Sequence, residues 1–415
     1  MLLLWLYDAG IALYVAALHI AAVFHPKARK WVQGRTGWEA RLKREIAEKF
    51  SPGKPRLWMH CASLGEFEQG RPVLEAWRKE RPDTQILLTF FSPSGYEIRK
   101  DYPGADIVAY LPADTPRAAR RFVELVQPDW VIFVKYEFWL RTLFALFRRN
   151  IPVLLISAVF RPVQIFFKGY GGLWKKALSE FQHIFVQDVA SLELLQQHGI
   201  QRCSIAGDTR VDRVVSIAEE GREIETVKHF TAGHRTLIAG STWPPDEELL
   251  AVLLRENLLP GWKFIIAPHQ ISESNLRRIE ALLPAESARF SAINPAQTLL
   301  PAVLLIDNIG MLNALYRYGD LAYIGGGFGA GIHNTLEPMA FGLPVIFGPK
   351  YKKFREAVEM VQNGGAVSVN NAEDFRRAIV HFAEENHRRQ ARESALQYLR
   401  DNAGATEKIL GRPGL

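Results

Sequence analysis

The longest stretch of hydrophobic positions lies at the amino terminus. Residues 2–24, LLLWLYDAGIALYVAALHIAAVF, contain one charged residue, Asp8, and one histidine, His19. As an α-helix this stretch is about 34 Å long, enough to cross a hydrocarbon core of about 30 Å. We therefore expect residues 1–24 to be a membrane anchor. A cleaved signal peptide and a buried or interfacial helix are the alternatives, but a signal peptide carries positive charge ahead of its apolar run and this chain has none there.

Beyond residue 55, short runs rich in Val, Ile and Leu alternate with segments whose apolar residues have helical spacing, such as 71–82 and 115–127. Continuous apolar runs of this kind are typical of parallel strands covered on both faces. Two such series indicate an α/β protein with two Rossmann-like domains facing a cleft. The expected strands are 56–62, 85–91, 106–111, 130–135, 153–158 and 183–187, and then 236–241, 264–269, 303–307, 321–327 and 344–349.

The same pattern predicts the segment boundaries. Ligands of doubly wound sheets bind at the carboxyl ends of the strands, so we expect the loops that follow the strands to carry the function. The expected segments are a membrane anchor (1–24), a basic juxtamembrane segment (25–54), an amino-terminal Rossmann-like domain (55–207), a polar linker (208–235), a carboxyl-terminal Rossmann-like domain (236–371) and terminal helices that could pack back on the first domain (372–415).

Charge is concentrated next to the apolar run. The chain of 415 residues has a net charge of +7, and residues 25–50 alone carry eight Lys or Arg against three Glu. By the positive-inside rule this places the bulk of the chain in the cytoplasm. No RNA-binding signature accompanies the basic residues, so a membrane surface is preferred over nucleic acid as the anionic partner. The two cysteines, Cys61 and Cys203, are too few for a disulfide framework.

Several catalytic motifs do not occur. The sequence has no HExxH, no CxxC pair, no aspartate-rich DxD-like cluster at a strand end, no Walker A motif and no GxSxG elbow. A zinc protease, a P-loop NTPase and a serine hydrolase are therefore excluded. We expect neither a metal nor a cofactor.

The segment GGGFGAGIHNTLE, residues 325–337, has five glycines in its first seven positions and then a helix signature. Glycine allows positive φ and lets a ligand approach the main chain. Free amides and the start of the next helix suit a phosphate or nucleotide. The alternative is that Asn334 and Glu337 form a capping box, although capping does not require five glycines. The expected contacts are Gly326, Gly327, Gly329, Gly331, His333, Asn334 and Glu337.

Acidic residues at two other places are candidates for a catalytic role. Glu137 follows an expected strand, where a carboxylate points into the cleft; it could equally be an exposed acid or a partner of Lys135. Glu39 has the spacing of an ordinary helix-surface pair with Lys43. The segment SLGE, residues 63–66, either binds an anion or caps the following helix.

Basic residues near the ends of expected strands also have two possible roles, binding an anion or lying in solvent. Arg161 is either an anion clamp or a surface charge. Lys350, Lys352 and Lys353 follow the strand after the glycine segment, and we expect at least two of them to lie in solvent.

Short motifs follow one another along nearly the whole chain. They are the anchor, GWEARL, HCASLGEFEQGRPVLEAW, TFFSPSGYE, KYEFW, ISAVFRP, AGDTRVDRV, GSTWPPDEE, APHQ, GGGFGAGIHNTLEPMAFGLPVIFGP and FREA. Taken in this order, they resemble the Kdo transferases, the 3-deoxy-D-manno-octulosonic acid transferases of lipopolysaccharide assembly. The resemblance implies the GT-B fold and transfer of Kdo from CMP-Kdo to a hydroxyl of a lipid A precursor. It further implies inversion, a general base, no tightly held metal and a location at the cytoplasmic face of the inner membrane.

The resemblance also assigns roles. Glu39 matches the catalytic base and Glu137 a second catalytic acid, although Lys135 replaces a further acid of that motif. Glu337 is expected on the ribose hydroxyls. The remaining CMP-site matches are Ser241, Thr242, Pro268 and His269, with Ala267-Pro268 in place of the usual Arg. The acceptor-side or Kdo-contacting matches are Ser63, Gly65, Ser94, Arg161 and Arg210. Basic residues 27–44 are expected to hold the acceptor's phosphates and the anionic leaflet.

Two other functions remain open. One is a different GT-B enzyme acting on a UDP-sugar, a transferase or an epimerase, although an epimerase has no use for residues 2–24. The other is a non-catalytic, membrane-bound anion-binding module, which the intact acids at Glu39 and Glu137 argue against.

Overall fold

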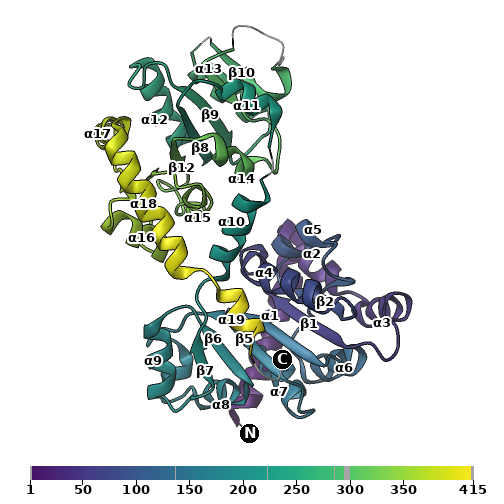
Figure 1. Cartoon of the computed structure of the whole chain (residues 1–415). Helices are drawn as coiled ribbons and strands as arrows, with labels where there is room; N and C mark the ends of the chain where they lie inside the picture. Colours follow the sequence, from purple (N-terminus) through teal and green to yellow (C-terminus); the bar gives the residue numbers. More distant parts are fainter. Residues whose placement is uncertain (1, 136, 222, 285, 294–299, 413–415) are drawn as a thin grey trace. The chain divides into compact units, whose positions relative to one another are not determined.

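The chain forms two compact units, which are shown in a computed structural model that describes residues 2–135, 137–221, 223–284, 286–293 and 300–412 (Figure 1). Unit 1 is Met1–Asp212 together with Ala403–Leu415, and unit 2 is Arg213–Asn402. Within the described residues, each unit contains a seven-stranded sheet whose neighbouring strands are all parallel. These features confirm the expected α/β class.

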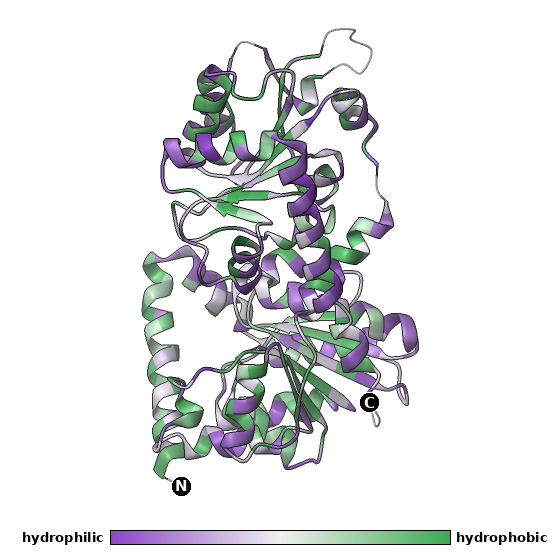
Figure 2. Ribbon diagram, turned by 60° about the vertical axis from the view of Figure 1, so that its left-hand side comes forward, coloured by the Kyte–Doolittle hydropathy of each residue, from purple (hydrophilic) through white to green (hydrophobic). Residues whose placement is uncertain are grey.

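Unit 1 begins with three helices, α1 (Leu2–Phe24), α2 (Pro26–Arg35) and α3 (Trp38–Lys49). Figure 2 shows α1 as hydrophobic along nearly its whole length. It is the one helix in the described part of the chain that is long and apolar enough to cross a membrane.

The sheet of unit 1 has the strand order β3-β2-β1-β4-β5-β6-β7. Its strands are β1 (Arg56–Cys61), β2 (Gln85–Phe90), β3 (Ile107–Tyr110), β4 (Trp130–Val134), β5 (Val153–Ala158), β6 (His183–Val186) and β7 (Cys203–Ile205). The helices between them are α4 (Leu64–Glu80), α5 (Pro93–Arg99), α6 (Pro116–Val126), α7 (Leu140–Phe147), α8 (Gly172–Glu180) and α9 (Val189–Gln197).

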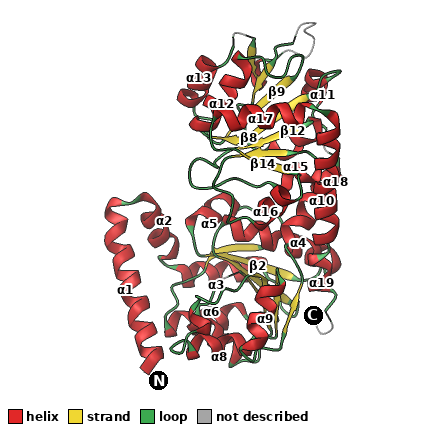
Figure 3. Ribbon diagram, turned by 90° about the vertical axis from the view of Figure 1, so that its left-hand side faces the viewer, coloured by secondary structure: helices red, strands yellow, loops and turns green. Residues whose placement is uncertain are grey.

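Both faces of this sheet are buried, which explains the continuous apolar runs. On β1, Trp58 belongs to a core shared with α6, α7 and α8, whereas its neighbours Leu57 and Met59 belong to a core shared with α4. Successive side chains of a strand point to opposite faces, so every position of the central strands is apolar or internally bonded. Helices on the two sides of the sheets are visible in Figure 3.

Unit 2 repeats the arrangement with the order β10-β11-β9-β8-β12-β13-β14. Its strands are β8 (Thr236–Thr242), β9 (Lys263–Pro268), β10 (Ser287–Arg289), β11 (Val303–Leu305), β12 (Leu321–Ile324), β13 (Val345–Phe347) and β14 (Ala366–Ser368). Its helices are α11 (Glu225–Thr231), α12 (Pro244–Arg255), α13 (Glu273–Leu282), α14 (Leu312–Leu315), α15 (Leu336–Ala340), α16 (Arg355–Gln362), α17 (Ala372–Ala383) and α18 (Glu385–Asn402).

Two expected segments take a different form. The expected linker, 208–235, is largely helical, with α10 (Thr209–Glu220) crossing the boundary between the units and α11 following it. Of the expected terminal helices, α17 and α18 belong to unit 2, and only the last residues, with α19 (Ala405–Leu410), belong to unit 1.

The returning segment is fastened to unit 1 by polar and apolar contacts. The carboxylate of Asp212 accepts hydrogen bonds from the amides of Gly404 (2.7 Å) and Thr406 (2.6 Å). Ile409 and Leu410 are buried in the core beside α4. A carboxylate at the start of a helix satisfies amides that have no partner within the helix, so Asp212 stabilises α19.

Candidate functional site

In unit 2, three predicted nucleotide-site segments meet at the carboxyl ends of β8, β9 and β12. The strand β8 pairs with both β9 and β12, so their ends are adjacent. The amide of His269 donates to the carbonyl of Thr242 (2.9 Å), and the amide of Gly325 donates to that of Gly240 (3.0 Å). Ser241, Thr242, Pro268, His269 and the glycine segment are thus brought together as the topology predicts.

Three aromatic rings stack beside these strand ends. The rings of Trp243 and His269 lie 4.5 Å apart and those of His269 and His333 lie 4.7 Å apart, both nearly parallel. The indole nitrogen of Trp243 donates to Nε2 of His333 (3.0 Å). Burial, together with His269, lowers the pKa of His333, so the imidazole is held neutral. Trp243 was not predicted as a site residue, although it stands in the quoted motif GSTWPPDEE.

Most of the glycines are explained by the fold itself. Gly326 and Gly331 have φ of 91° and 144°. A Cβ at Gly325 would lie 2.3 Å from the carbonyl oxygen of Ser241, and one at Gly327 would lie 2.6 Å from the backbone of Gly348. Such contacts exclude any side chain at these positions.

The expectation of free amides in this loop is wrong at three positions. The amide of Gly326 donates to Asp246 Oδ2 (2.9 Å), and the amides of Gly329 and Gly331 donate to the carbonyl of Gly326 (2.9 and 3.3 Å). The tight turn satisfies these amides internally, and Gly329 nevertheless lies exposed. Gly329 differs in one respect: a Cβ there would meet its nearest atom at 3.5 Å, an ordinary contact.

Asp246, which the sequence analysis did not single out, holds the loop in place. Its carboxylate accepts hydrogen bonds from the amides of Trp243 and Gly326 (2.9 Å each) and from the hydroxyl of Tyr323 (2.7 Å). Burial raises the pKa of this carboxyl, and the three donors act against that shift. Asp246 therefore links β12, the loop and the first turn of α12.

The end of the glycine segment departs from the predicted capping box. The N-cap of α15 is Thr335, and α15 has only five residues, so its dipole is small. Asn334 accepts the amide of Leu336 at 3.1 Å and donates its own amide group to Glu337 Oε1 at 3.0 Å. Glu337 thus bonds to the side chain of Asn334 instead of reaching back to the main chain.

Two further nucleotide-site residues have internal roles. The hydroxyl of Thr242 donates to Glu247 (3.0 Å), which is buried and paired with Arg278. Ser241 adopts φ of 52°, so the chain turns sharply where β8 ends. Lys350 donates from Nζ to the carbonyl of Gly329 (2.6 Å), whereas Lys352 and Lys353 lie exposed, as expected.

In unit 1, an acidic cluster lies at the carboxyl ends of β1 and β4. Glu137 Oε2 accepts the indole N–H of Trp139 (2.5 Å) and lies 3.5 Å from Nε2 of His60, which is fully buried. Nδ1 of His60 bonds to the hydroxyl of Thr89 at 2.8 Å. Glu137 is therefore oriented by an indole and a buried imidazole.

Glu66 completes this cluster. It forms the capping box of α4 with Ser63, whose amide donates to Glu66 Oε2 (3.0 Å). Burial first, and the nearby Glu137 second, raise the pKa of Glu66 to about 7, and Lys135 acts in the opposite direction. Capping therefore explains Ser63 and Glu66. It does not explain Gly65, because a Cβ there would meet nothing within 4 Å.

Glu39 occupies a different part of unit 1. It lies in the first turn of α3 and pairs with Arg121 of α6 (2.6 Å) instead of with Lys43. Its side chain is 44% exposed. Among the described residues, no hydrogen bond or ion pair joins Glu39 to Glu137.

The expected acceptor-side residues are spread along unit 1. Ser94 lies exposed in the first turn of α5, with its hydroxyl 3.0 Å from that of Ser92. Arg161 is exposed after β5. Arg210 donates from Nε to both carboxylate oxygens of Asp208 (3.1 and 2.9 Å). The structure does not gather these three side chains with the Glu66–Glu137 cluster through any contact among the described residues.

The basic segment is only partly available to a membrane or an acceptor. Arg35 is buried, with its guanidinium 3.9 Å from the ring centre of Trp31, and burial lowers its pKa to about 9. Arg41 donates to the carbonyl of Thr36 (3.3 Å). Between residues 27 and 44 the exposed cations are Lys27, Arg29, Lys30, Lys43 and Arg44.

Comparison with known proteins shows what the chain is similar to. A family model described as 3-deoxy-D-manno-octulosonic-acid transferase (kdotransferase) matches residues 36–213. The curated 3-deoxy-D-manno-octulosonic acid transferase of Aquifex aeolicus is 29% identical over 333 residues, covering 78% of this chain and 86% of the relative. The enzymes of the same name from Haemophilus influenzae and Chlamydia muridarum are 28% and 27% identical and cover 89% and 93% of this chain, and 91% of each relative.

Superposition on solved structures shows which fold the chain has. The UDP-GlcNAc 2-epimerase of Neisseria meningitidis superposes with a TM-score of 0.61 at 15% identity, over 86% of this chain and 98% of that one. The UDP-GlcNAc 2-epimerase of Methanocaldococcus jannaschii gives 0.54 at 15% identity, over 80% and 94%. At this identity the likeness shows the fold alone, which is GT-B. The family model and the relatives together support the 3-deoxy-D-manno-octulosonic acid transferase family for this chain.

Proposed function

We propose that this protein transfers Kdo from CMP-Kdo to a hydroxyl of a lipid A precursor, with inversion at the anomeric carbon. The observation that carries the proposal is the meeting of three strand ends in unit 2, which brings the glycine loop beside a stack of three rings. The relatives that share both units are named for Kdo transfer.

The donor nucleotide is proposed to bind at this place in unit 2. The Trp243–His269–His333 stack offers a ring face to a cytosine base. The Glu337 carboxylate, held by Asn334, suits the ribose hydroxyls as an acceptor of hydrogen bonds. Lys350, already within reach of the loop carbonyl of Gly329, supplies a cation for the departing phosphate.

The chemical step needs a base for the acceptor hydroxyl and stabilisation of the leaving CMP. We assign the base to Glu39, following the family resemblance. Because Arg121 pairs with Glu39, the arriving acceptor has to displace that guanidinium before the carboxylate can take a proton. Glu137 is assigned a second catalytic role beside Glu66. No resident metal or cofactor is needed in this scheme.

We further propose that the enzyme works at the cytoplasmic face of the inner membrane, where α1 holds it beside its lipid acceptor. The exposed cations Lys27, Arg29, Lys30, Lys43 and Arg44 suit the acceptor's phosphates and the anionic leaflet. Nucleic acid is not a proposed partner.

The test is incubation of the purified protein with CMP-Kdo and a lipid A precursor, followed by mass measurement of the lipid. The expected product is the precursor heavier by one or more Kdo residues. A protein that leaves the precursor unchanged while converting a UDP-sugar would overturn the proposal in favour of the UDP-sugar enzyme. Competition between CMP and UDP for binding separates the same two cases without the lipid. A protein that binds anions but turns over neither donor would be the non-catalytic module.

A further inference from the structure

We propose that α1 lies in the plane of a single membrane leaflet, held lengthwise against unit 1, and does not cross the bilayer. The outward face of this helix would contact lipid acyl chains, and its inward face contacts protein. The inference concerns how the protein meets the membrane, and it stands independently of the reaction assigned above.

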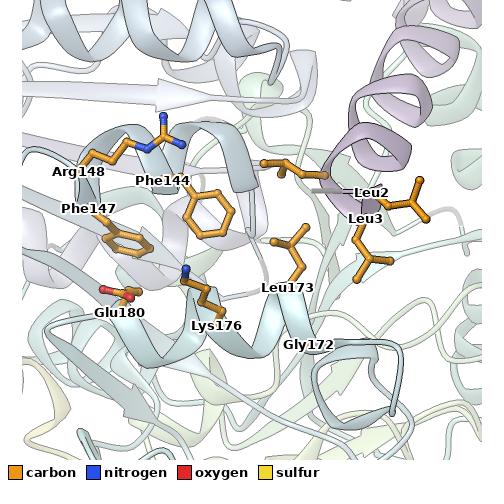
Figure 4. A pocket seen from close by; sticks show the side chains of 10 residues that line it. Leu2, Leu3, Phe144, Phe147, Arg148, Gly172, Leu173, Lys176 and Glu180 are labelled. Atoms are coloured by element: carbon orange, nitrogen blue, oxygen red, sulfur yellow. The ribbon is translucent and has the colours of Figure 1, made fainter.

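The first turn of α1 lies against α7 and α8. Leu2, Leu3 and Leu4 line a cavity of about 700 Å³ whose other walls come from Phe144 and Phe147 of α7 and from α8. Figure 4 shows the side chains of Leu2 and Leu3 on one side of this cavity and Phe144, Phe147 and Leu173 on the other. The amino-terminal end of the helix is therefore a neighbour of the folded unit.

A second attachment follows one turn later, and it is polar. The hydroxyl of Tyr7 donates to Asp114 Oδ2 (2.5 Å) and accepts the amide of Leu140 (3.3 Å). Asp8 pairs with Arg141, whose Nε lies 2.7 Å from Asp8 Oδ1. The charge of Asp8, which counts against a spanning helix, is thus neutralised by a residue in the first turn of α7.

Two more attachments follow toward the carboxyl end. The ring of Tyr14 lies 6.2 Å from that of Trp31 and 6.4 Å from that of Phe91. Arg29 donates to the carbonyls of Ala22 (3.1 Å) and Val23 (2.9 Å), so α2 caps the last turn of α1. Unit 1 therefore contacts the helix at its start, middle and end.

The exposure pattern gives the same result. The half-buried positions of α1 are 4, 7, 8, 11, 15, 18, 21 and 22. They recur every three or four residues, so they form one face along the whole helix. Beyond the first turn, the outward side carries large apolar residues that are at least 60% exposed, namely Trp5, Leu6, Leu13, Ile20, Val23 and Phe24. A long apolar face with cations beside it, such as Lys27 and Lys30, is the composition of an interfacial helix.

These attachments are incompatible with a spanning helix. Asp8 precedes Phe24 by 16 residues, so in a spanning α1 it would lie about 24 Å into the bilayer from the side of Phe24. Arg141 would have to accompany it. Since Leu140, Leu143 and Leu146 of α7 are buried in the core of unit 1, the sheet and its loops would enter the hydrocarbon, where unpaired backbone groups are not tolerated.

Sided labelling of the full-length protein tests the topology. A single cysteine in a short Gly-Ser extension ahead of residue 1 is compared with His25→Cys, in sealed vesicles that expose unit 1 to the outside. The two native cysteines are buried, which keeps the background low. A membrane-impermeant maleimide is expected to label both sites from outside at similar rates. Labelling of the extension only after the vesicles are permeabilised would overturn the proposal.

Cross-linking tests the lengthwise contact directly. The pair Leu3→Cys with Leu173→Cys is expected to form an intramolecular cross-link with a short bifunctional thiol reagent in the membrane-bound protein. The matched control is Phe24→Cys with Leu173→Cys, whose partner lies about 30 Å further along the helix and is expected to stay unlinked. Equal yields from the two pairs, or none from the first, would contradict the proposal.

The outward face could instead be covered by a second copy of the chain. Flotation with vesicles of phosphatidylethanolamine and phosphatidylglycerol distinguishes the two occupants. Binding is expected, with Trp5→Asp plus Leu13→Asp reducing the bound fraction at least tenfold. A wild-type protein that stays off the vesicles as a dimer, which this double variant converts to a monomer, would assign the face to a second copy. Neither readout depends on transferase activity.

Discussion

At the scale of single residues, the glycines fall into two kinds: those that the fold requires and those where a side chain would fit. Gly325 and Gly327 lack side chains because the backbone of a neighbouring segment occupies that space, and Gly326 and Gly331 because of their positive φ. Gly65 and Gly329 have room for a Cβ. A glycine in the first turn of a helix costs stability relative to alanine, and packing does not require one at Gly65.

Gly329→Ala tests this distinction in unit 2. The variant is expected to unfold within about 1 kcal/mol of wild type, because its Cβ makes only ordinary contacts. It is expected to bind CMP about tenfold more weakly, a loss of about 1.4 kcal/mol. Urea denaturation and titration calorimetry provide the two measurements. Gly327→Ala is the control, since its collision with Gly348 should destabilise the protein by about 1–3 kcal/mol. Unchanged CMP affinity in Gly329→Ala would place the nucleotide away from this loop.

Glu66 supplies a prediction about pH. Its pKa is raised to about 7 from about 4.5, so the folded protein keeps a proton that the unfolded chain loses above pH 4.5. Ionisation therefore costs stability as the pH rises from 4.5 to 7, by up to about 3 kcal/mol. Glu66→Gln removes this cost and still caps α4. The variant should gain stability relative to wild type between pH 5 and pH 8 in urea denaturation; a difference that is constant with pH would refute the assigned cause.

At the scale of elements, the strands that are buried on both faces could be predicted from the sequence, and the half-exposed strands could not. The central strands were predicted to within about two residues at most of their ends, because a strand covered on both faces is apolar throughout. The strands β7, β10 and β14 were missed. Each has three residues, lies at the edge of its sheet and is half-exposed at two or more positions, so none has an apolar run. The polar composition of 208–235 likewise concealed α10.

The return of the chain to unit 1 is a contact that no local pattern could reveal, and it can be measured. Asp212→Ala removes the acceptor for the amides of Gly404 and Thr406 at the start of α19. We expect a loss of about 1–2 kcal/mol in the free energy of unfolding, the usual cost of losing a capping carboxylate. The control is Asp101→Ala, an exposed position. Equal stability of the two variants would show that α19 is held by its apolar side chains alone.

At the scale of the whole molecule, the sequence predicted which loops meet but not which side chains bond. Parallel topology brings Thr242, His269 and the glycine loop together because their strands are neighbours. The partners that orient the site lie far away in sequence, such as Asp246 for Gly326, His60 for Glu137 and Arg121 for Glu39. Such pairs form only where elements that are distant in sequence pack together. The pattern of a single sequence does not show which elements do so.

The pairing of Glu39 with Arg121 gives the prediction that bears most on mechanism. If Glu39 is the base, Glu39→Gln should lower kcat by about 10²–10⁴-fold and leave the affinity for CMP-Kdo unchanged, since a base contributes to the chemical step and the donor is proposed to bind in unit 2. Glu137→Gln is the matched comparison, because it removes one carboxylate from the other acidic cluster. Single-turnover rates with a lipid A precursor and donor binding by calorimetry separate the two effects.

The control for this prediction is Arg121→Ala, which frees the carboxylate of Glu39 without removing it. A base that must first lose its guanidinium partner should work at least as well in this variant, so its rate is expected to equal or exceed that of wild type. A wild-type rate in Glu39→Gln together with loss of activity in Glu137→Gln would move the base to the buried cluster. There the raised pKa of Glu66, beside Glu137, already lies near the pH at which a general base is most effective.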